Sequence, residues 1–414
     1  MKKLLLGTSA LVVAGFAAAS APAQAQTQPF GSPNFAVTVG GYARQYVTAV
    51  GQDNAGLTTR KGVDQTSDNR LILTFRAAVP NGMSAGAVWQ INPNAGTSSG
   101  NSITRRMWSF LEGSFGQVQL GGADNVAAQG AVSAPEAFNG GFVVGDNNAL
   151  GINVNRVGVS AAGPQSGNPA TGLDIDGISN KIVYWTPRIE GFQLGLNYTP
   201  TMSYRQGVDT TNNQYLNGFA GNLNFTRTFG SLGVKASAGY VTFEKPSGVN
   251  LTTATQNSLK NPSAYNAGLS FNLMGFDFGG SYSKMDNWRG IGAGSTTQAN
   301  AAVADGLRNF NGYTYDLGIG YTFGAAMVSV NYASSRNDHS TVTNGVVAQQ
   351  ANGKDKIDVW GASGRYTLAP GVMANLGVFT AKYVEGDGVN ASFFNSTKSS
   401  SRANGVVTGL TLTF

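Results

Sequence analysis

Residues 313–323 have the sequence YTYDLGIGYTF, in which large apolar side chains alternate with small or polar ones. Successive side chains of a β-strand point to opposite faces of the sheet, so this stretch predicts a long strand with one apolar and one polar face. The same alternation recurs at residues 71–79 and 192–198, and the chain ends on a similar stretch that closes with Phe414. The pattern is that of an all-β protein.

Alternation and turn residues together predict sixteen strands. They are expected at residues 35–50, 70–79, 83–92, 104–113, 116–122, 179–187, 191–200, 215–228, 231–243, 262–273, 275–286, 310–323, 325–336, 354–368, 371–384 and 402–414. The connections alternate between very short turns, such as Pro80-Asn81-Gly82, and long polar segments rich in Asn, Ser, Thr and Gly. All long segments therefore fall at one end of the strands and all short turns at the other.

The composition excludes several classes of protein. The chain has 414 residues, of which 12% are charged, with no Cys, one His and a formal net charge of +6. Without cysteine there can be no disulfide, iron–sulfur cluster or thiol nucleophile, and one histidine cannot supply a site that needs two imidazoles. So small a net charge does not indicate a nucleic-acid partner. We also expect no cofactor.

The first 25 residues have the pattern of an export signal. Lys2 and Lys3 precede an apolar core at residues 4–19, and Ala23-Gln24-Ala25 forms a small-x-small cleavage site. The core is shorter than the roughly 20 residues of a membrane-spanning helix. We therefore expect residues 1–25 to be a removable signal peptide and residues 26–414 to form one domain.

The remaining sequence predicts a membrane protein that crosses the bilayer with strands. No later stretch has 18 consecutive apolar residues, whereas the strands are on average long enough to cross with tilt, which takes about 9–11 residues. Long loops on one side and short turns on the other are typical of transmembrane barrels. The barrel must close, because an open edge in lipid leaves backbone groups unpaired.

The number of strands predicts what such a barrel does. A barrel of about sixteen to eighteen strands encloses an aqueous channel, whereas about eight strands leave an interior that side chains fill. The weakly charged polar faces suit the wall of a water-filled lumen. Glycines on the inward faces are expected to keep that lumen wide and to ease strand curvature. We thus predict a 16-stranded antiparallel transmembrane β-barrel with long extracellular loops and short periplasmic turns.

Three motifs resemble those of the Gram-negative general porins. Residues 108–122, WSFLEGSFGQVQLGG, resemble that family's hairpin ending in Phe-Gly-x-Val-x-Leu-Gly, residues 180–187 followed by Gly191 and Phe192 form a second mark, and the terminal Phe414 is a third. The resemblance implies a homotrimer in the bacterial outer membrane, in which the third long loop folds inward and narrows each channel. Its partners would be further copies of itself, outer-membrane lipid, and small hydrophilic solutes and ions.

The candidate constriction combines this loop with the facing wall. Residues 135–141, PEAFNGG, are similar to the family's Pro-Glu-Phe-Gly-Gly segment, with Ala137 and Asn139 as extra residues. Strand parity sends basic side chains inward, namely Arg44, Arg70, Arg76, one of Arg105 and Arg106, and Lys181, while the loop carries Asp124, Glu136, Asp146, Asp174 and Asp176. Opposed rows of charge in a narrow neck would screen solutes by sign. The alternative for each residue is a local ion pair or a solvated loop.

Other chemistry has weaker support in the sequence. Asp174 and Asp176 are a weak calcium candidate, but the third carboxylate and closing Glu of an EF-hand are missing, and an Asx turn is the alternative. His339 is expected in an outer loop, where a catalytic dyad is implausible. We therefore expect no enzyme, and an outer-membrane hydrolase is the most remote alternative.

The predicted function is passive diffusion of small hydrophilic solutes and ions through an outer-membrane channel. Two alternatives stay open. A substrate-specific channel for sugars or phosphate would need a ladder of aromatic side chains or a dense basic row along the lumen. A structural or adhesive barrel would instead act through its long outer loops.

Overall fold

The computed structural model describes residues 28–29, 35–52, 60–93, 104–139, 141–144, 173, 175–177, 179–202, 215–245, 260–288, 310–343, 346–384 and 400–414. The predicted signal peptide, residues 1–25, lies outside these ranges, as do most residues of the long connections.

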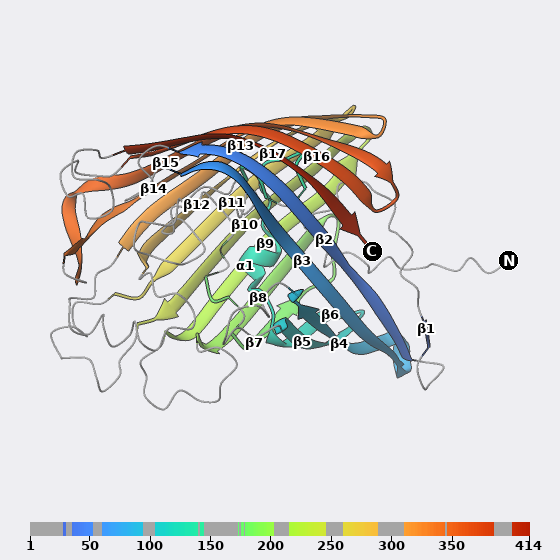
Figure 1. Ribbon diagram of the computed structural model, residues 1–414. Coiled ribbons are helices and arrows are strands. Elements are labelled where there is room, and N and C mark those ends of the chain that lie inside the picture. The colour runs from blue at the N-terminus through green and yellow to red at the C-terminus, as the bar shows by residue number, and fades with distance from the viewer. Residues whose placement is uncertain are drawn as a thin grey trace.

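The strands form a closed antiparallel barrel (Figure 1), as predicted. Each strand from β2 to β17 pairs with the next, and β17 pairs back with β2 from Ala403 opposite Gln52 to Thr413 opposite Tyr42. Their bounds are β2 (Phe35–Gln52), β3 (Arg60–Val79), β4 (Met83–Ile91), β5 (Thr104–Gly113), β6 (Gly116–Gly122), β7 (Lys181–Trp185), β8 (Phe192–Thr201), β9 (Leu216–Phe229), β10 (Leu232–Glu244), β11 (Ser263–Leu273), β12 (Phe276–Trp288), β13 (Phe310–Phe323), β14 (Ala326–Thr343), β15 (Val346–Ala369), β16 (Val372–Val384) and β17 (Ser400–Thr413).

Helical structure is minimal in the part of the chain that the structure describes. It consists of α1 (Val126–Gln129) and a 3-10 turn, Pro80–Gly82. No helix among the described residues is long and apolar enough to span a membrane.

Three strands are longer than predicted, and one short strand was not predicted. β3 begins at Arg60 rather than residue 70, β14 continues through residues 337–343, and β15 already includes residues 346–353, all expected to belong to an outer loop. His339 is therefore a residue of strand β14. These extensions lack a clear apolar alternation, yet backbone pairing continues through them, because ladder hydrogen bonds do not require an apolar face. The two-residue β1 (Gln28–Pro29) pairs with the start of β2.

The short turns at one end follow from backbone conformation. Between β11 and β12, where Leu273 pairs with Phe276, the two linking residues Met274 and Gly275 have φ of 50° and 86°. Positive φ at both central positions is the requirement of a type I′ hairpin turn, whose twist matches that of the flanking strands. Such turns need few residues, so the long segments are confined to the opposite end.

The outward faces of the strands form an apolar belt. In β13 the outward side chains of Leu317 and Ile319 are 57% and 43% exposed, whereas the inward Asp316 is fully buried. Cross-strand neighbours continue the belt on both sides, with Ile319 paired to Phe278 and Val330. The exposed apolar face and the buried polar face are the reverse of a soluble protein, and suit a barrel surrounded by hydrocarbon.

We predict that charge on this belt destabilises the barrel according to depth. Ile319 lies near the middle of the outward row of β13 and Tyr313 near its end. Ile319→Arg should lower the free energy of unfolding by about 2–4 kcal/mol, and Tyr313→Arg by about 0–1 kcal/mol, because the charge enters hydrocarbon only in the first variant. Urea titration of the protein folded in phospholipid vesicles measures both. Equal losses would contradict the assignment of this face to lipid.

Candidate functional site

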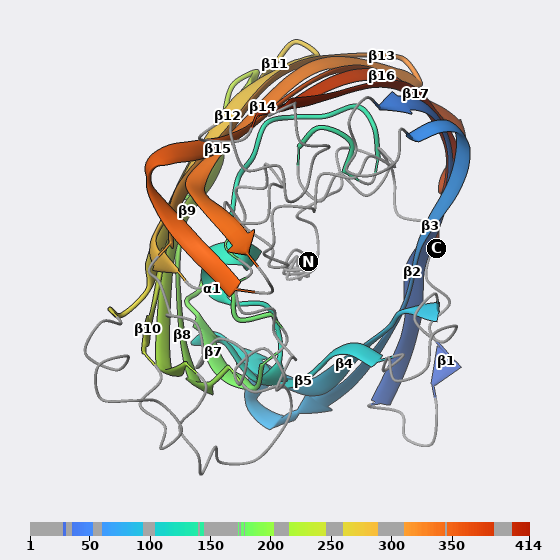
Figure 2. The same cartoon turned by 60° about the vertical axis from the view of Figure 1, so that its left-hand side comes forward.

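The third long connection enters the barrel directly after β6. Asn125 caps α1, since its side-chain oxygen accepts a hydrogen bond from the backbone N–H of Ala128 at 2.9 Å. The Asn197 side-chain oxygen, on β8, accepts another from the N–H of Val126 at 2.9 Å. The chain then runs along the inside of the wall, where Figure 2 shows it in teal with α1 beside it. We call residues 123–144, as far as they are described, the inner loop.

Polar side chains of successive strands hold the backbone of the inner loop. Ser237 of β10 accepts the N–H of Val132 at 2.9 Å, and Asp316 of β13 accepts the N–H of Ala134 at 2.8 Å. The series continues across the barrel with Asn331 donating to Pro135 O, Ser329 accepting from Ala137 N, Ser363 from Phe138 N, Asn375 from Asn139 N, and Tyr46 donating to Asn139 O. The inner loop is thus fastened from β8 around to β16 and β2.

Inward glycines leave the space in which the inner loop lies. A Cβ at Gly318 would stand 2.8 Å from Pro135 O, and one at Gly377 would stand 2.6 Å from the ring of Phe142. At Gly268 an added Cβ would collide with the backbone of Val132. These glycines were predicted to keep the lumen wide, but here they allow the loop backbone to approach the wall closely.

The far end of the inner loop packs as an aromatic cluster. The rings of Phe138 and Phe142 stack at 4.9 Å between centroids, and Phe142 meets Phe379 of β16 edge-on at 6.0 Å. Tyr46 of β2 packs against Phe138 at 5.3 Å. All four side chains are buried in one apolar cluster inside the barrel. Aromatic burial of this kind anchors the end of the loop to the wall.

Glu136 is turned back into the inner loop. Its Oε1 accepts the N–H groups of Val143 at 2.6 Å and Val144 at 3.3 Å, and its Oε2 accepts that of Phe142 at 3.0 Å. Burial raises the pKa of the Glu136 carboxyl to about 7, although the three amide bonds work in the opposite direction. The carboxyl therefore closes the turn of the loop on itself, whereas the sequence placed it in an acidic row opposite the basic wall.

Arg44 joins the wall to the inner loop. Its guanidinium donates to Asp68 of β3 and to the side chain of Asn139, both at 3.1 Å. Arg70, on β3 beside it, lies 3.6 Å from the other oxygen of Asp68. One carboxylate thus lies between two guanidinium groups at the edge of the loop, which leaves this patch with a net positive charge.

Three of the other predicted wall cations, Arg76, Arg106 and Lys181, each have an acidic partner. Arg76 of β3 pairs with Glu112 of β5 and keeps a side chain that is 43% exposed, the largest fraction among these cations. Arg106, rather than Arg105, is the buried inward residue of β5, and it pairs with Asp124 at the root of the inner loop. Arg105 lies where the register between β4 and β5 shifts.

Lys181 forms a buried anchor for the returning chain. Its ammonium donates to the backbone oxygens of Ala123, Gly177 at 3.0 Å and Ser179 at 2.9 Å, and lies 3.5 Å from Asp176. Asp176 also accepts hydrogen bonds from Asn125 at 2.7 Å and Thr199 at 2.9 Å. This fully buried cluster ties both ends of the third connection to β7 and β8, away from any open passage.

Two of the predicted acidic residues, Asp146 and Asp174, lie outside the described residues. The calcium candidate therefore has only Asp176 within the described ranges. In those ranges, no three acidic or histidine side chains gather as a metal site requires.

Sequence reasoning missed the neutral side chains that fasten the inner loop. It considered charged residues only, although Ser329, Asn331 and Ser363 are also inward by parity and are buried. A signal was present, because inward Asn and Ser alternate with Gly on the same strands, as in residues 375–377 and 361–363. A wall open to water would not need glycine beside each polar residue.

We predict that removing the Glu136 carboxyl loosens the inner loop and leaves the barrel intact. Glu136→Ala leaves three amides without their acceptor, at about 1–3 kcal/mol each. Hydrogen exchange at Phe142, Val143 and Val144 should therefore accelerate by about tenfold or more. Mass spectrometry of the detergent-solubilised protein measures this, with the exposed Glu190→Ala as control. Unchanged exchange in the first variant would show that the carboxyl does not hold the turn.

Comparison with known proteins agrees with this geometry. Residues 8–388 match the family model described as Gram-negative porin. Among solved structures, the anion-selective porin from Comamonas acidovorans is 19% identical with a TM-score of 0.55. The match covers 92% of this chain and 100% of the Comamonas chain.

Two further solved structures show the same fold. The outer membrane channel DcaP of Acinetobacter baumannii is 12% identical, with a TM-score of 0.56, 93% coverage of this chain and 99% of its own. The trimer form of OmpT, an outer membrane protein of Vibrio cholerae, is 12% identical with a TM-score of 0.56. The match covers 92% of this chain and 100% of the OmpT chain. No curated protein sequence matches the chain. Because the family model spans most of its length, this chain belongs to the Gram-negative porins, the channel-forming β-barrels of the outer membrane.

Proposed function

We propose that this porin is a non-specific diffusion channel for small hydrophilic solutes and ions, and that its passage runs between the inner loop and the arc of β3–β6. The observation that carries the proposal is the fastening of the inner loop from β8 to β16 and β2. A loop held along that part of the wall narrows the lumen from one side. The remaining arc, which includes Arg70, Arg76 and Gln119, then forms the opposite side of the opening.

We expect this opening to discriminate only weakly by charge. Arg76 and Arg106 each face an acidic partner, and Asp68 lies between Arg44 and Arg70. Paired charges set up short-range fields that fall off within about a Debye length. The surplus of one guanidinium at Asp68 gives the passage a slight preference for anions.

Self-association is part of the proposal. OmpT of Vibrio cholerae, which has the same fold, has a trimer form, and the apolar outward belt would be covered by lipid and by further copies of the chain. If one assembly contains three parallel channels, we expect its conductance to fall in three equal steps as the channels close.

Planar-bilayer recording of the folded, detergent-purified protein tests the channel. We expect the conductance to rise in steps as channels insert, and to increase linearly with salt concentration. We expect no saturable block by any one sugar or phosphate. An absence of conductance steps would refute the channel, and competitive block by one solute would favour a specific channel instead.

The role of the basic wall can be tested at Arg76, the most exposed of its cations. Arg76→Glu replaces a positive by a negative charge beside Glu112, so the anion-to-cation permeability ratio should fall by about twofold or more. The reversal potential in a salt gradient gives this ratio. Arg227→Gln, on the outward face near the short turns, is the matched control and should leave the ratio unchanged. A ratio that does not move in the Arg76 variant would place the selectivity elsewhere.

A further inference from the structure

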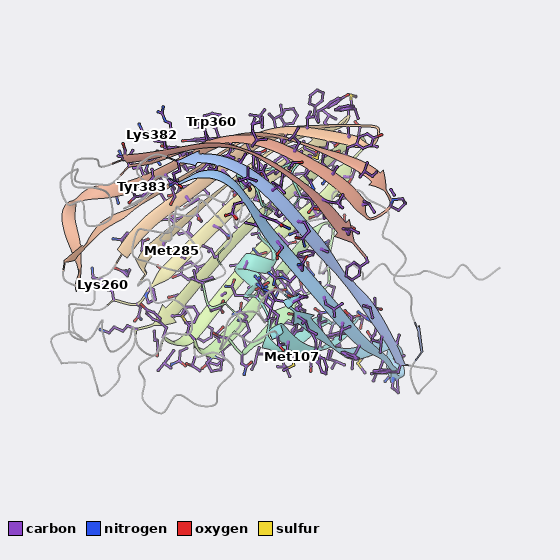
Figure 3. The ribbon with its side chains drawn as sticks, in the orientation of Figure 1. Met107, Lys260, Met285, Trp360, Lys382 and Tyr383 are labelled. Atoms are coloured by element: carbon purple, nitrogen blue, oxygen red, sulfur yellow. The ribbon has the colours of Figure 1, made fainter. Side chains whose placement is uncertain are left out.

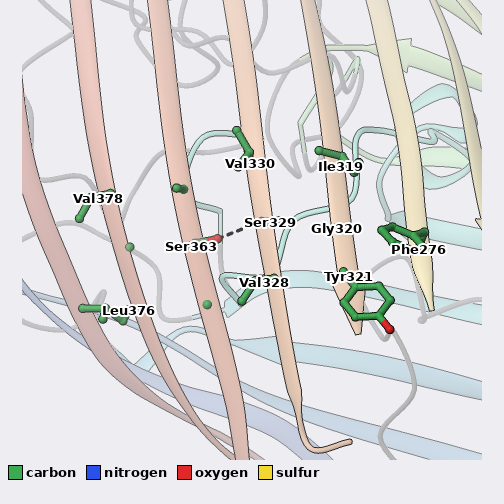
Figure 4. Close-up of a pocket in the computed structure, with 13 residues that line it drawn as sticks. Phe276, Ile319, Gly320, Tyr321, Val328, Ser329, Val330, Ser363, Leu376 and Val378 are labelled. Atoms are coloured by element: carbon green, nitrogen blue, oxygen red, sulfur yellow. Dashed lines mark hydrogen bonds between the residues drawn. The ribbon is translucent and has the colours of Figure 1, made fainter. Parts of the chain in front are cut away.

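Large apolar side chains lie on part of the inner wall as well as on the outer belt. On the outer face they are expected, and Figure 4 shows Val328, Val330 and Leu376 around an apolar hollow there. The inner wall of a channel is polar as a rule. Yet the arc of β3–β6, which bounds the passage proposed above, carries four inward apolar residues, which we call the inward apolar patch: Ile72, Val88, Trp108 and Phe110.

The patch is continuous across neighbouring strands. Register places Val88 of β4 opposite Trp108 of β5, and Phe110 opposite Gly86. The alternate side chains of β5 point the other way, since Met107 is 46% exposed on the outside of the barrel (Figure 3). Successive side chains of a strand point to opposite faces, so Trp108 and Phe110 share the inner face.

The guanidinium of Arg76 lies over one end of the patch. Its Cζ is 5.0 Å from the centroid of the Phe110 ring, and that ring lies against Gly86, where an added Cβ would stand 2.6 Å from it. Nη1 of Arg76 donates to Ser84 Oγ at 2.8 Å and to Glu112. Nη2 has no hydrogen-bond partner among the residues that the structure describes. The guanidinium is thus held in place with one nitrogen available to a solute.

A solute at this position meets the cation of the ion pair rather than its acid. The side chain of Arg76 is 43% exposed, whereas that of Glu112 is 15% exposed. Glu112 also accepts hydrogen bonds from Ser84 at 2.9 Å and from Gln117 at 2.8 Å, so both of its oxygens are engaged by the wall. The exposed charge beside the patch is therefore positive and suits an anionic group.

Trp108 provides an aromatic surface at the other end of the patch. It is half-buried and packs against the apolar cluster at the root of the inner loop, which includes Ala123 and Val126. This packing restricts the indole while part of it stays exposed. Trp108 and Phe110 are two residues apart, about 7 Å along the strand. One small molecule can therefore reach both the indole and the guanidinium that covers Phe110.

From this arrangement we propose that the passage wall carries a subsite for planar aromatic carboxylates. The ring of the solute packs on Trp108 and Val88, and its carboxylate accepts a charge-assisted hydrogen bond from Nη2 of Arg76. A planar guanidinium suits this role, because it binds carboxylates and stacks on aromatic rings. The inference rests on the proposed diffusion channel and adds one class of solute that is weakly retained. Sugars lack the charge and inorganic phosphate lacks the ring, so neither is retained.

Bilayer reversal potentials test the subsite with two anions of similar size. Benzoate and cyclohexanecarboxylate have the same charge, but only benzoate is flat and has a π-face. With one anion on each side of the membrane, the wild-type channel should favour benzoate by about threefold. Equal permeability of the two anions would overturn the proposal. Chloride conductance in the same bilayers reports on the channel itself, so failure of the channel and failure of the subsite give different results.

Two variants separate the aromatic contact from the charge. Trp108→Leu keeps an apolar side chain but removes the π-face, and Arg76→Lys keeps the positive charge but removes the planar guanidinium. Each should abolish most of the preference for benzoate and leave the chloride-to-sodium permeability ratio unchanged. Trp89→Leu, which alters the neighbouring outward tryptophan of β4, is the matched control and should keep the preference. A preference that persists in both test variants would arise elsewhere in the channel and would overturn the proposal.

Discussion

A sheet that crosses hydrocarbon cannot leave an edge unpaired, and the pairing of β17 with β2 meets this constraint. Each exposed N–H or C=O in lipid would cost several kcal/mol, so closure of the ring takes precedence over local sequence preference. This explains why each strand from β2 to β17 is paired on both sides where it crosses the belt. Once the ring is closed, one side of every strand meets lipid and the other is available for function.

The inner wall supports the loop as well as bounding the passage. Between β8 and β16 its Asn, Ser and Gly residues alternate, so that a polar side chain binds the loop backbone where the neighbouring glycine makes room for it. Buried backbone groups of the loop are thereby satisfied without water. The arc of β3–β6 has a different composition, with arginines and their acidic partners. The low content of charged residues in the chain reflects this division, since most of the inner wall binds a neutral backbone.

Much of the fold could be predicted from period-two alternation, because the apolar belt imposes that pattern on every spanning strand. The extra residues of β3, β14 and β15 could not, since pairing beyond the belt leaves no apolar signature. Parity placed Arg44, Arg76 and Lys181 inward correctly, but it does not say what lies opposite each one. Lys181 meets backbone oxygens of its own loop, and Glu136 meets the amides of residues 142–144. Those contacts depend on the path of a long irregular segment, which has no periodicity to read.

Asn, Ser and Tyr side chains fasten the inner loop to the wall, and Asp316 is the one carboxylate in that series. This has a consequence when the salt concentration of the medium changes. Neutral hydrogen bonds are not screened by electrolyte. The width of the opening is thereby separated from its electrostatics. Salt can alter how ions are sorted at the arginine arc, while the size limit for uncharged nutrients stays the same.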